Sequence, residues 1–156
     1  MLYDGYTPKL WITLTEANGT DPIKGMERVS KFLMELSFTT KSHLLVFRAG
    51  DYGHNFHEHI IILVPNKESD RFDDRLPKFR SWGHWKFRHS DFQKWDTSKG
   101  NGAFVYQDNH INWKSGGDKL PAFDPYVICP KVFRRCRNNK CEHNNHGIRR
   151  IVNHHP

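Results

Sequence analysis

Two histidines separated by a single residue, His57 and His59, open an apolar, β-branched run that ends at Pro65. Such a run predicts a buried strand over residues 57–65. Because successive side chains of a strand point to opposite faces, the two imidazoles should share one face, about 7 Å apart. At that spacing they could chelate one divalent ion together with a third ligand from a neighbouring element. The alternative is that each histidine is an ordinary hydrogen-bonded residue of the surface or core.

The third ligand would have to come from a segment close to this strand. Asp51 is the first candidate, because it precedes the strand by a short turn and would lie across a hairpin from His57. Glu58 stands between the two histidines, so strand alternation points its carboxylate to the other face, where Lys24 or Arg28 could pair with it. His54, in the turn itself, is a lesser candidate.

Three elements before this strand should position it. Residues 9–16 alternate between apolar and other side chains, which predicts a strand with an inward and an outward face. The outward face would present three residues, Trp11, Thr13 and Thr15. Asp21 and Pro22 fit the N-cap and the first position of an amphipathic helix that continues to about Leu36. Residues 43–48 predict a second strand, which the turn before His57 converts into a hairpin.

The chain after Pro65 is more polar. It predicts a short helix around residues 70–79, a strand over 82–89, a helix near 99–109 and a last short strand at 110–113. Together with the elements before Pro65, this order predicts an α+β fold. We expect an antiparallel sheet of about five strands with helices packed on one face.

The predicted strand over residues 82–89 places aromatic and cationic residues on one face. These residues are Trp82, His84, Lys86 and Arg88, with Trp85 and Phe87 on the opposite face. Alternating rings and cations suit contact with a nucleic-acid backbone and its bases. The alternative is a solvated edge strand whose charges discourage aggregation.

Composition and charge limit the classes of protein to consider. With 156 residues, 37% hydrophobic, the chain is long and apolar enough for a globular domain rather than a disordered one. Seven Lys and Arg against one Glu fall between residues 128 and 156, so nearly all of the net charge of +7 lies there. We therefore expect a domain over residues 1–127 and a basic tail over 128–156 that suits a polyanion. No stretch resembles a membrane span or a secretion signal, which predicts an intracellular protein without a membrane partner.

The tail also concentrates cysteine and histidine. Four residues offer a possible tetrahedral zinc site: Cys136, Cys141, His143 and His146. Cys129 could replace one of them. Their spacing is not that of a common zinc finger. The alternative is a flexible, basic, His-rich tail that happens to contain cysteines.

Three segments together resemble the motifs of the HUH endonuclease superfamily, in particular the rolling-circle replication initiator (Rep) domains of circular single-stranded DNA viruses and plasmids. Residues 11–15 (Trp-Ile-Thr-Leu-Thr) resemble the first motif of that family, and residues 57–61 (His-Glu-His-Ile-Ile) resemble the second. Residues 102–109 stand where the third motif, Tyr-x-x-Lys, would be expected. The resemblance covers about residues 8–114 and depends on the order and spacing of the motifs.

The resemblance implies a ferredoxin- or RRM-like fold and site-specific cleavage of single-stranded DNA by a tyrosine. Cleavage would leave a covalent 5′-phosphotyrosine and a free 3′-hydroxyl, with Mg²⁺ or Mn²⁺ as the cofactor held by the two histidines and an acid. The implied DNA partner is an origin, such as a hairpin, with a host or viral helicase and polymerase as further partners. The implied location is the cytoplasm, or the nucleus of an infected cell.

The third motif leaves the nucleophile open. If Gln107 is aligned with the lysine of the family, Phe104 occupies the nucleophile position, and the chain would be an inactive form. If the alignment is shifted, Tyr106 is the nucleophile. Two further functions also stay open: a single-strand nucleic-acid-binding module without catalysis, and a transposase-type HUH enzyme.

Overall fold

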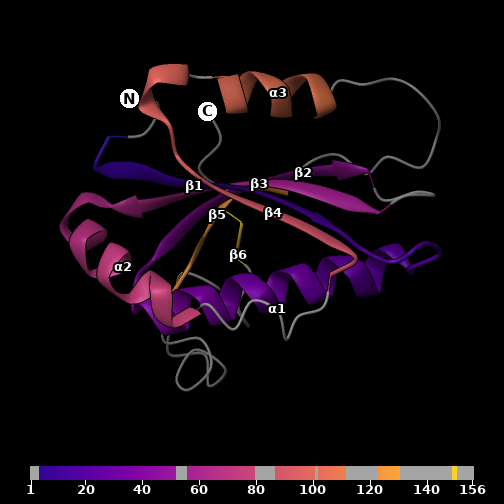
Figure 1. Cartoon of the computed structure of the whole chain (residues 1–156), viewed down its shortest axis with the longest axis horizontal. Coiled ribbons are helices and arrows are strands. Elements are labelled where there is room, and N and C mark those ends of the chain that lie inside the picture. The colour runs from indigo at the N-terminus through magenta and orange to yellow at the C-terminus, as the bar shows by residue number, and fades with distance from the viewer. Residues whose placement is uncertain are drawn as a thin grey trace.

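The central strand of the sheet, β3 (His57–Pro65), has the bounds that its apolar run predicts. In the computed structural model, the described residues are 4–51, 56–79, 87–100, 102–111, 123–130 and 149–150. Within them, six strands form one antiparallel sheet in the order β4-β1-β3-β2-β5-β6 (Figure 1). The other strands are β1 (Tyr6–Thr15), β2 (Leu44–Asp51), β4 (His89–Lys94), β5 (Phe123–Ile128) and β6 (Arg149–Arg150). The predicted antiparallel α+β class is confirmed.

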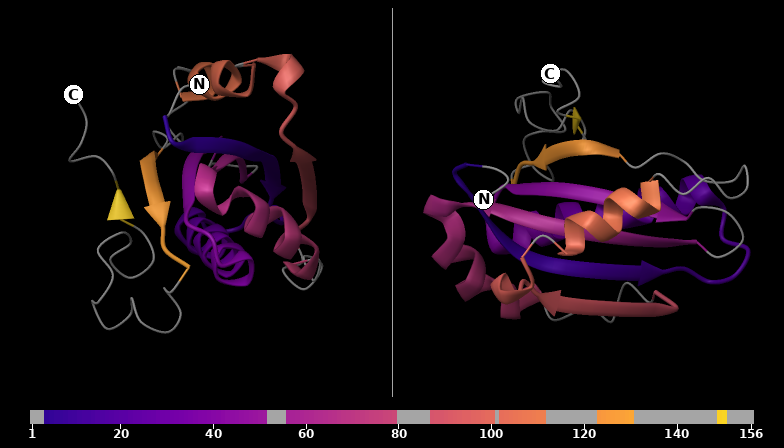
Figure 2. Two further views of the ribbon diagram at one scale, coloured as in Figure 1. Left: turned by 90° about the vertical axis from the view of Figure 1, so that its left-hand side faces the viewer. Right: turned by 90° about the horizontal axis from the view of Figure 1, so that it is seen from above.

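The first four strands follow the ferredoxin-like succession β-α-β-β-α-β, with α1 (Pro22–Thr40) and α2 (Ser69–Arg75) as the two helices. Both of these helices lie on the same side of the sheet (Figure 1). A third helix, α3 (Gly102–Ile111), lies over the opposite side, as two perpendicular views also show (Figure 2). The prediction placed all helices on one face, so α3 is the departure from it.

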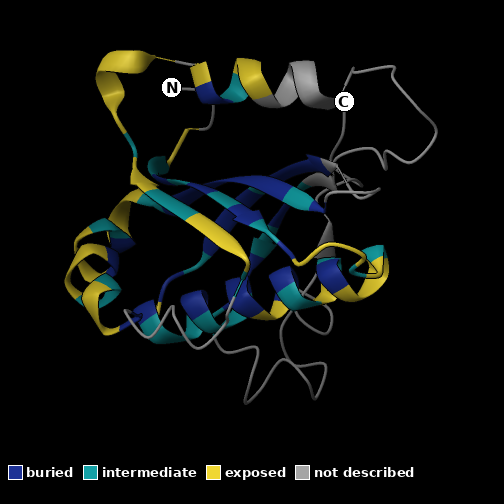
Figure 3. Cartoon of the chain, turned by 45° about the vertical axis from the view of Figure 1, so that its right-hand side comes forward, coloured by how far each residue is buried: buried dark blue, intermediate teal, exposed yellow. Residues whose placement is uncertain are grey.

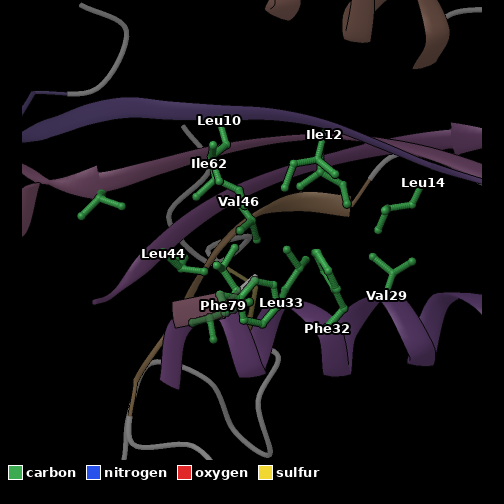
Figure 4. Close-up of a cluster of buried hydrophobic side chains, with 14 of the residues drawn as sticks. Leu10, Ile12, Leu14, Val29, Phe32, Leu33, Leu44, Val46, Ile62 and Phe79 are labelled. Carbon is green, nitrogen blue, oxygen red and sulfur yellow. The ribbon is translucent and has the colours of Figure 1, made fainter. Parts of the chain in front are cut away.

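The side of the sheet that faces α1 contains the main core. Inward residues of β1, β2 and β3 meet an apolar stripe of α1 in a cluster with almost no exposed surface (Figures 3 and 4). The principal members of this cluster are Leu10, Ile12, Leu14, Val29, Phe32, Leu33, Leu44, Val46, Ile60 and Ile62. Each fully buried aliphatic or aromatic side chain of this kind contributes about 1.5–3 kcal/mol. This face is therefore the main source of stability.

The ends of α1 follow from local side-chain chemistry. At the N-terminus, the Asp21 carboxylate accepts a hydrogen bond from the Lys24 N–H at 3.2 Å, and Pro22 occupies the first turn, as predicted. The helix runs four residues past the predicted end at Leu36. Over this extra turn, the Thr40 hydroxyl donates to the Leu36 carbonyl at 2.8 Å. Lys41, in the left-handed conformation with φ of 51°, then ends the helix.

A close contact between α1 and the sheet fixes the beginning of β3. A Cβ atom at Gly25 would lie 2.6 Å from the ring of Phe56, so only glycine allows the ring to approach the helix this closely. Phe56 is itself buried, and its carbonyl accepts a hydrogen bond from the Glu16 N–H at 3.0 Å. The residue that precedes His57 is therefore held by both α1 and β1.

Three details of the C-terminal half differ from the predictions. The strand predicted at residues 110–113 is wrong for its first two residues, because they belong to α3; residues 112–113 lie outside the described part. Strands β5 and β6 were not predicted. Since β5 continues to Ile128 and Arg149–Arg150 pair with it, the domain boundary predicted after residue 127 falls within the sheet.

Candidate functional site

The two histidines of β3 lie side by side on the face covered by α3. Their ring centroids are 5.2 Å apart with an interplanar angle of 76°. His59 is buried and His57 is half-buried. The expectation that both imidazoles share one face is confirmed.

Residues of the neighbouring strands surround this pair in register. On β1, Thr15 lies opposite His57 and Thr13 lies opposite His59. On β2, Asp51 lies opposite His57. The outward face predicted for β1 therefore borders the histidine pair, as its alternation required.

Thr13 orients one of the imidazoles. Its Oγ1 atom lies 3.1 Å from Nδ1 of His59. If Nε2 of His59 is to bind a cation or accept a proton, Nδ1 must carry the ring hydrogen and donate it to the threonine oxygen. The threonine oxygen can accept that hydrogen bond, so its position is compatible with the tautomer that a ligand of this kind needs.

A tyrosine of α3 completes the cluster. The Tyr106 ring centroid lies 4.9 Å from that of His59 and 5.8 Å from that of Trp11. Its side chain is 48% exposed, so the phenol can be reached from solvent. Helix α3 thus brings a potential nucleophile from a distant part of the sequence to the histidine pair.

Phe104 occupies a different environment on the same helix. Its ring packs edge-on against Phe47 of β2 at 5.2 Å and against Trp95 at 5.6 Å, within a small apolar cluster on this face. It therefore serves as an anchor that holds α3 on the sheet. Of the two residues considered for the nucleophile position, Tyr106 is therefore the one whose ring packs against a histidine, His59, among the described residues.

Glu58, between the two histidines, points to the α1 face, as strand alternation required. It is fully buried and forms a two-pronged ion pair with Arg48 of β2, with both contacts at 2.6 Å. Arg48 also donates to the Ser30 hydroxyl at 2.8 Å and to the Tyr126 hydroxyl at 3.0 Å. The expectation that Lys24 or Arg28 would pair with this carboxylate is wrong, because the arginine of the adjacent strand reaches it directly.

The spacing of the two imidazoles is compatible with a shared metal ion, although Nε2 of His59 is buried. Nitrogens that bind one ion lie about 2.1 Å from it, so the two ring centroids should be roughly 4.5–6.5 Å apart, and the observed spacing is 5.2 Å. Asp51 is the predicted third ligand and is next to His57 in the strand register, but its side chain lies outside the described part. His54 is outside it altogether. Among the described side chains, no group of three metal-ligating residues occurs.

The nucleic-acid-binding strand predicted over residues 82–89 is displaced. Trp82, His84 and Lys86 lie outside the described residues, and the strand β4 begins only at His89. Arg88 precedes it and donates to the Asn18 side chain at 2.7 Å. Phe87 packs against Phe32 in the main core. The prediction followed the better apolar alternation, whereas the real strand is a polar edge strand paired with β1.

Several residues near the site were not expected from the sequence. They border a pocket next to Tyr106 and come from the end of β4, the following turn and the first turn of α3. These residues are Gln93, Lys94, Trp95, Lys99 and Gly102. The Asp96-Thr97-Ser98 segment would suit the cap of the helix predicted near residues 99–109. In the structure Asp96 instead caps the single turn η3 (Thr97–Lys99), accepting from the Ser98 N–H at 3.0 Å, and α3 begins later, at Gly102.

The predicted zinc ligands are only partly described. Cys129 is buried directly after β5. Cys136, Cys141, His143 and His146 lie outside the described residues. The zinc site remains a prediction.

Comparison with known proteins gives no relative. No protein-family model matches the chain, and no curated protein or solved structure matches it significantly. Among the described residues, no helix is both long and apolar enough to cross a membrane.

Proposed function

We propose that this chain is a metal-dependent single-stranded DNA endonuclease and strand transferase of the HUH Rep type. The observation that carries the proposal is one cluster: the His57 and His59 rings 5.2 Å apart, with the Tyr106 ring 4.9 Å from His59. This combination offers two cation ligands and an oxygen nucleophile within one small volume. Such an enzyme would nick an origin, such as a DNA hairpin, to start rolling-circle replication with a separate helicase and polymerase.

The chemistry assigns a task to each group. The Tyr106 oxygen attacks the scissile phosphorus, the bond from phosphorus to the 3′ oxygen breaks, and a 5′-phosphotyrosine results. The phenol loses its proton to solvent, and the departing 3′ oxygen takes one up. His57 and His59 would hold the divalent ion, Mg²⁺ or Mn²⁺, with Asp51 as the third ligand. When bound, that ion supplies charge stabilisation at the phosphate oxygens.

The surroundings of the cluster support a single-stranded rather than a duplex substrate. Trp11 and Tyr106 provide neighbouring rings on a partly open sheet face, and unpaired bases stack on such rings. The hydroxyls of Thr13 and Thr15 lie in the adjacent strand and could contact phosphate oxygens. A duplex would present its bases stacked inside and could not use these rings.

The direct test is a covalent adduct. We expect the protein, incubated with Mn²⁺ and a pool of single-stranded oligonucleotides, to gain the mass of a DNA fragment in an intact-mass measurement. Tyr106→Phe should abolish the adduct, because phenylalanine has no oxygen to attack phosphorus. The matched control is Tyr6→Phe: this tyrosine lies at the other end of β1, about 30 Å along the strand from Thr15, and should leave the yield unchanged.

The histidines provide a second arm of the same test. His57→Ala should reduce the adduct yield more than about 100-fold, because loss of a direct metal ligand should exceed the 10–100-fold typical of outer-sphere partners. His43→Gln is the control, since His43 pairs with Glu68 away from the site. An adduct that persists in Tyr106→Phe, or is absent from wild-type protein with every oligonucleotide, would contradict the proposal.

A second function uses the same face without chemistry. The exposed Tyr106 beside Trp11 favours it, because stacking alone can hold single-stranded nucleic acid. Under this alternative, oligonucleotide binding would be tight, insensitive to chelator and free of any adduct. A transposase-type HUH enzyme would instead form the adduct but join the strand to a different target end.

A further inference from the structure

A pocket of about 330 Å³ opens beside the candidate nucleophile. Its lining includes the rings of Tyr106 and Trp11, which lie 5.8 Å apart, and Trp95, which follows β4. The first turn of α3, at Gly102 and Ala103, also lines it. Since Tyr106 also contacts His59, the pocket and the histidine pair share one side chain.

The chemistry of the lining suits a nucleotide. Three aromatic rings offer stacking surfaces, and the lining also includes two exposed cations, Lys94 and Lys99. Asp96 adds a hydrogen-bond acceptor. Hydrogen bonds from the hydroxyl and the backbone N–H of Ser98 lower the pKa of Asp96, so this carboxylate stays ionised and can accept from the amino or imino groups of a base.

We propose that this pocket receives one unpaired base of the bound strand, next to the phosphate that Tyr106 attacks. The inference rests on the proposed function for the position of that phosphate, but not for the binding of the base. A volume of about 330 Å³ is at the lower end of the range for small-molecule sites, about 300–1,000 Å³, which fits a single nucleotide better than a stretch of strand. Stacking between rings and contact with an acceptor would select which base enters.

Gly102 offers a way to fill the pocket without disturbing the fold. It is exposed, its backbone does not have a positive φ, and a Cβ atom placed there meets no atom within 4 Å. Gly102→Leu should therefore occupy pocket volume while α3 keeps its packing. Val105→Leu is the matched control, because Val105 is exposed on the same helix and does not line the pocket.

The experiment measures binding in the presence of EDTA, so that no cleavage is needed. Fluorescence anisotropy would compare labelled dT12, dA12 and dC12 with a 12-mer of abasic sugars that carries the same phosphate charge. We expect wild-type protein to bind at least one of the base-containing strands about fivefold or more tightly than the abasic strand. Gly102→Leu should lower the affinity for the preferred base-containing strand about fivefold and leave the affinity for the abasic strand unchanged. Val105→Leu should alter neither affinity.

The outcomes separate this inference from the proposed function. If Gly102→Leu, shown to be folded by its thermal transition, keeps the full preference for bases, the pocket inference is overturned even when the Tyr106 adduct forms. Absence of any preference for bases in wild-type protein also overturns it. If the preference is lost in Gly102→Leu but wild-type protein forms no adduct, the base pocket stands and the nuclease proposal fails.

Discussion

Glu58 and His59 are adjacent in β3 but face opposite sides of the sheet, and their burial and hydrogen-bond partners differ. On the α1 side, the Glu58 carboxylate is fully buried and both of its oxygens accept from Arg48. On the α3 side, the His59 ring lies against the Thr13 hydroxyl and the half-exposed Tyr106. One step along the strand separates a fully buried ion pair from a buried imidazole that lies against a half-exposed tyrosine.

The difference follows from what covers each face. Helix α1 is long and excludes water, so a charge on that side must be matched by an opposite charge and by hydrogen bonds. Arg48 meets this need by bonding also to Ser30, Tyr126 and the carbonyl of Met26 at 3.1 Å. Helix α3 is shorter, with 10 residues against 19 in α1, and its Val105 and Tyr106 are exposed. The α1 side therefore holds β2 and β3 in register, and that register places the histidines on the other side.

The largest effect should come from breaking the buried pair. Arg48→Met leaves Glu58 charged and unmatched in the core, which should lower the free energy of unfolding by about 3–5 kcal/mol in urea denaturation at pH 7. The double variant Arg48→Met/Glu58→Met should lose less than Arg48→Met alone, because it buries no unmatched charge. Lys31→Met is the control: Lys31 is exposed on α1, and its loss should change stability by no more than about 0.5 kcal/mol. Equal losses in the single and double variants would contradict the ion-pair argument.

A smaller and different effect should follow from a change on the other side. Thr13→Val keeps the β-branched shape but removes the oxygen that orients His59, so metal affinity and adduct formation should fall about 10–100-fold. Stability should change little, because the strand and its packing are preserved. Thr7→Val, on the same strand but bonded to Asn66 instead, is the control. If Thr13→Val unfolded the protein as much as Arg48→Met does, the division of roles between the two faces would be wrong.

Local patterns in the sequence were sufficient for the middle of the molecule. The apolar run after His59 gave β3 its bounds, and Asp21-Pro22 gave α1 its beginning. Strand alternation also placed the two histidines on one face. The same alternation, extended from Leu44 through Arg48, puts the arginine on the α1 side, where it is opposite Ile60 and diagonal to Glu58. The side of the sheet on which the partner of Glu58 lies could therefore have been found from the sequence.

The remaining features depend on contacts that no local pattern records. Strand β4 is an edge strand with a single apolar residue, Phe92, which is partly buried against the core among polar neighbours. Strand β5 contains Pro125, which argues against a paired strand, but the register shifts just there and accommodates it. The pocket beside Tyr106 could not be predicted at all, because it forms where α3 meets Trp11 of β1, the end of β4 and the turn that follows β4.

The smallest expected effect concerns a second carboxylate on the α1 side, Glu16. It is 6% exposed, and its only charged contact among the described residues is Arg28 at 3.4 Å, a weaker arrangement than that of Glu58. Burial raises the pKa of Glu16 above its ordinary value of 4.5, and the charge of Arg28 offsets this in part. The folded state therefore binds this proton more tightly than the unfolded state does. The stability that protonated Glu16 confers is present below the pKa of Glu16 in the unfolded state. It is lost as the pH rises through the pKa of Glu16 in the folded state.

Glu16→Gln removes that titration while keeping the size of the side chain. We expect the free energy of unfolding of the variant, measured in urea from pH 4 to pH 7, to fall less with rising pH than that of the wild type. At pH 7 the variant should be at least as stable, because a neutral amide costs less to bury than a poorly matched carboxylate. Glu27→Gln, exposed on α1, should leave the pH profile unchanged. A variant that is less stable at pH 7 and more stable at pH 4 would mean that Glu16 resembles Glu58, and that the whole α1 side depends on matched charges.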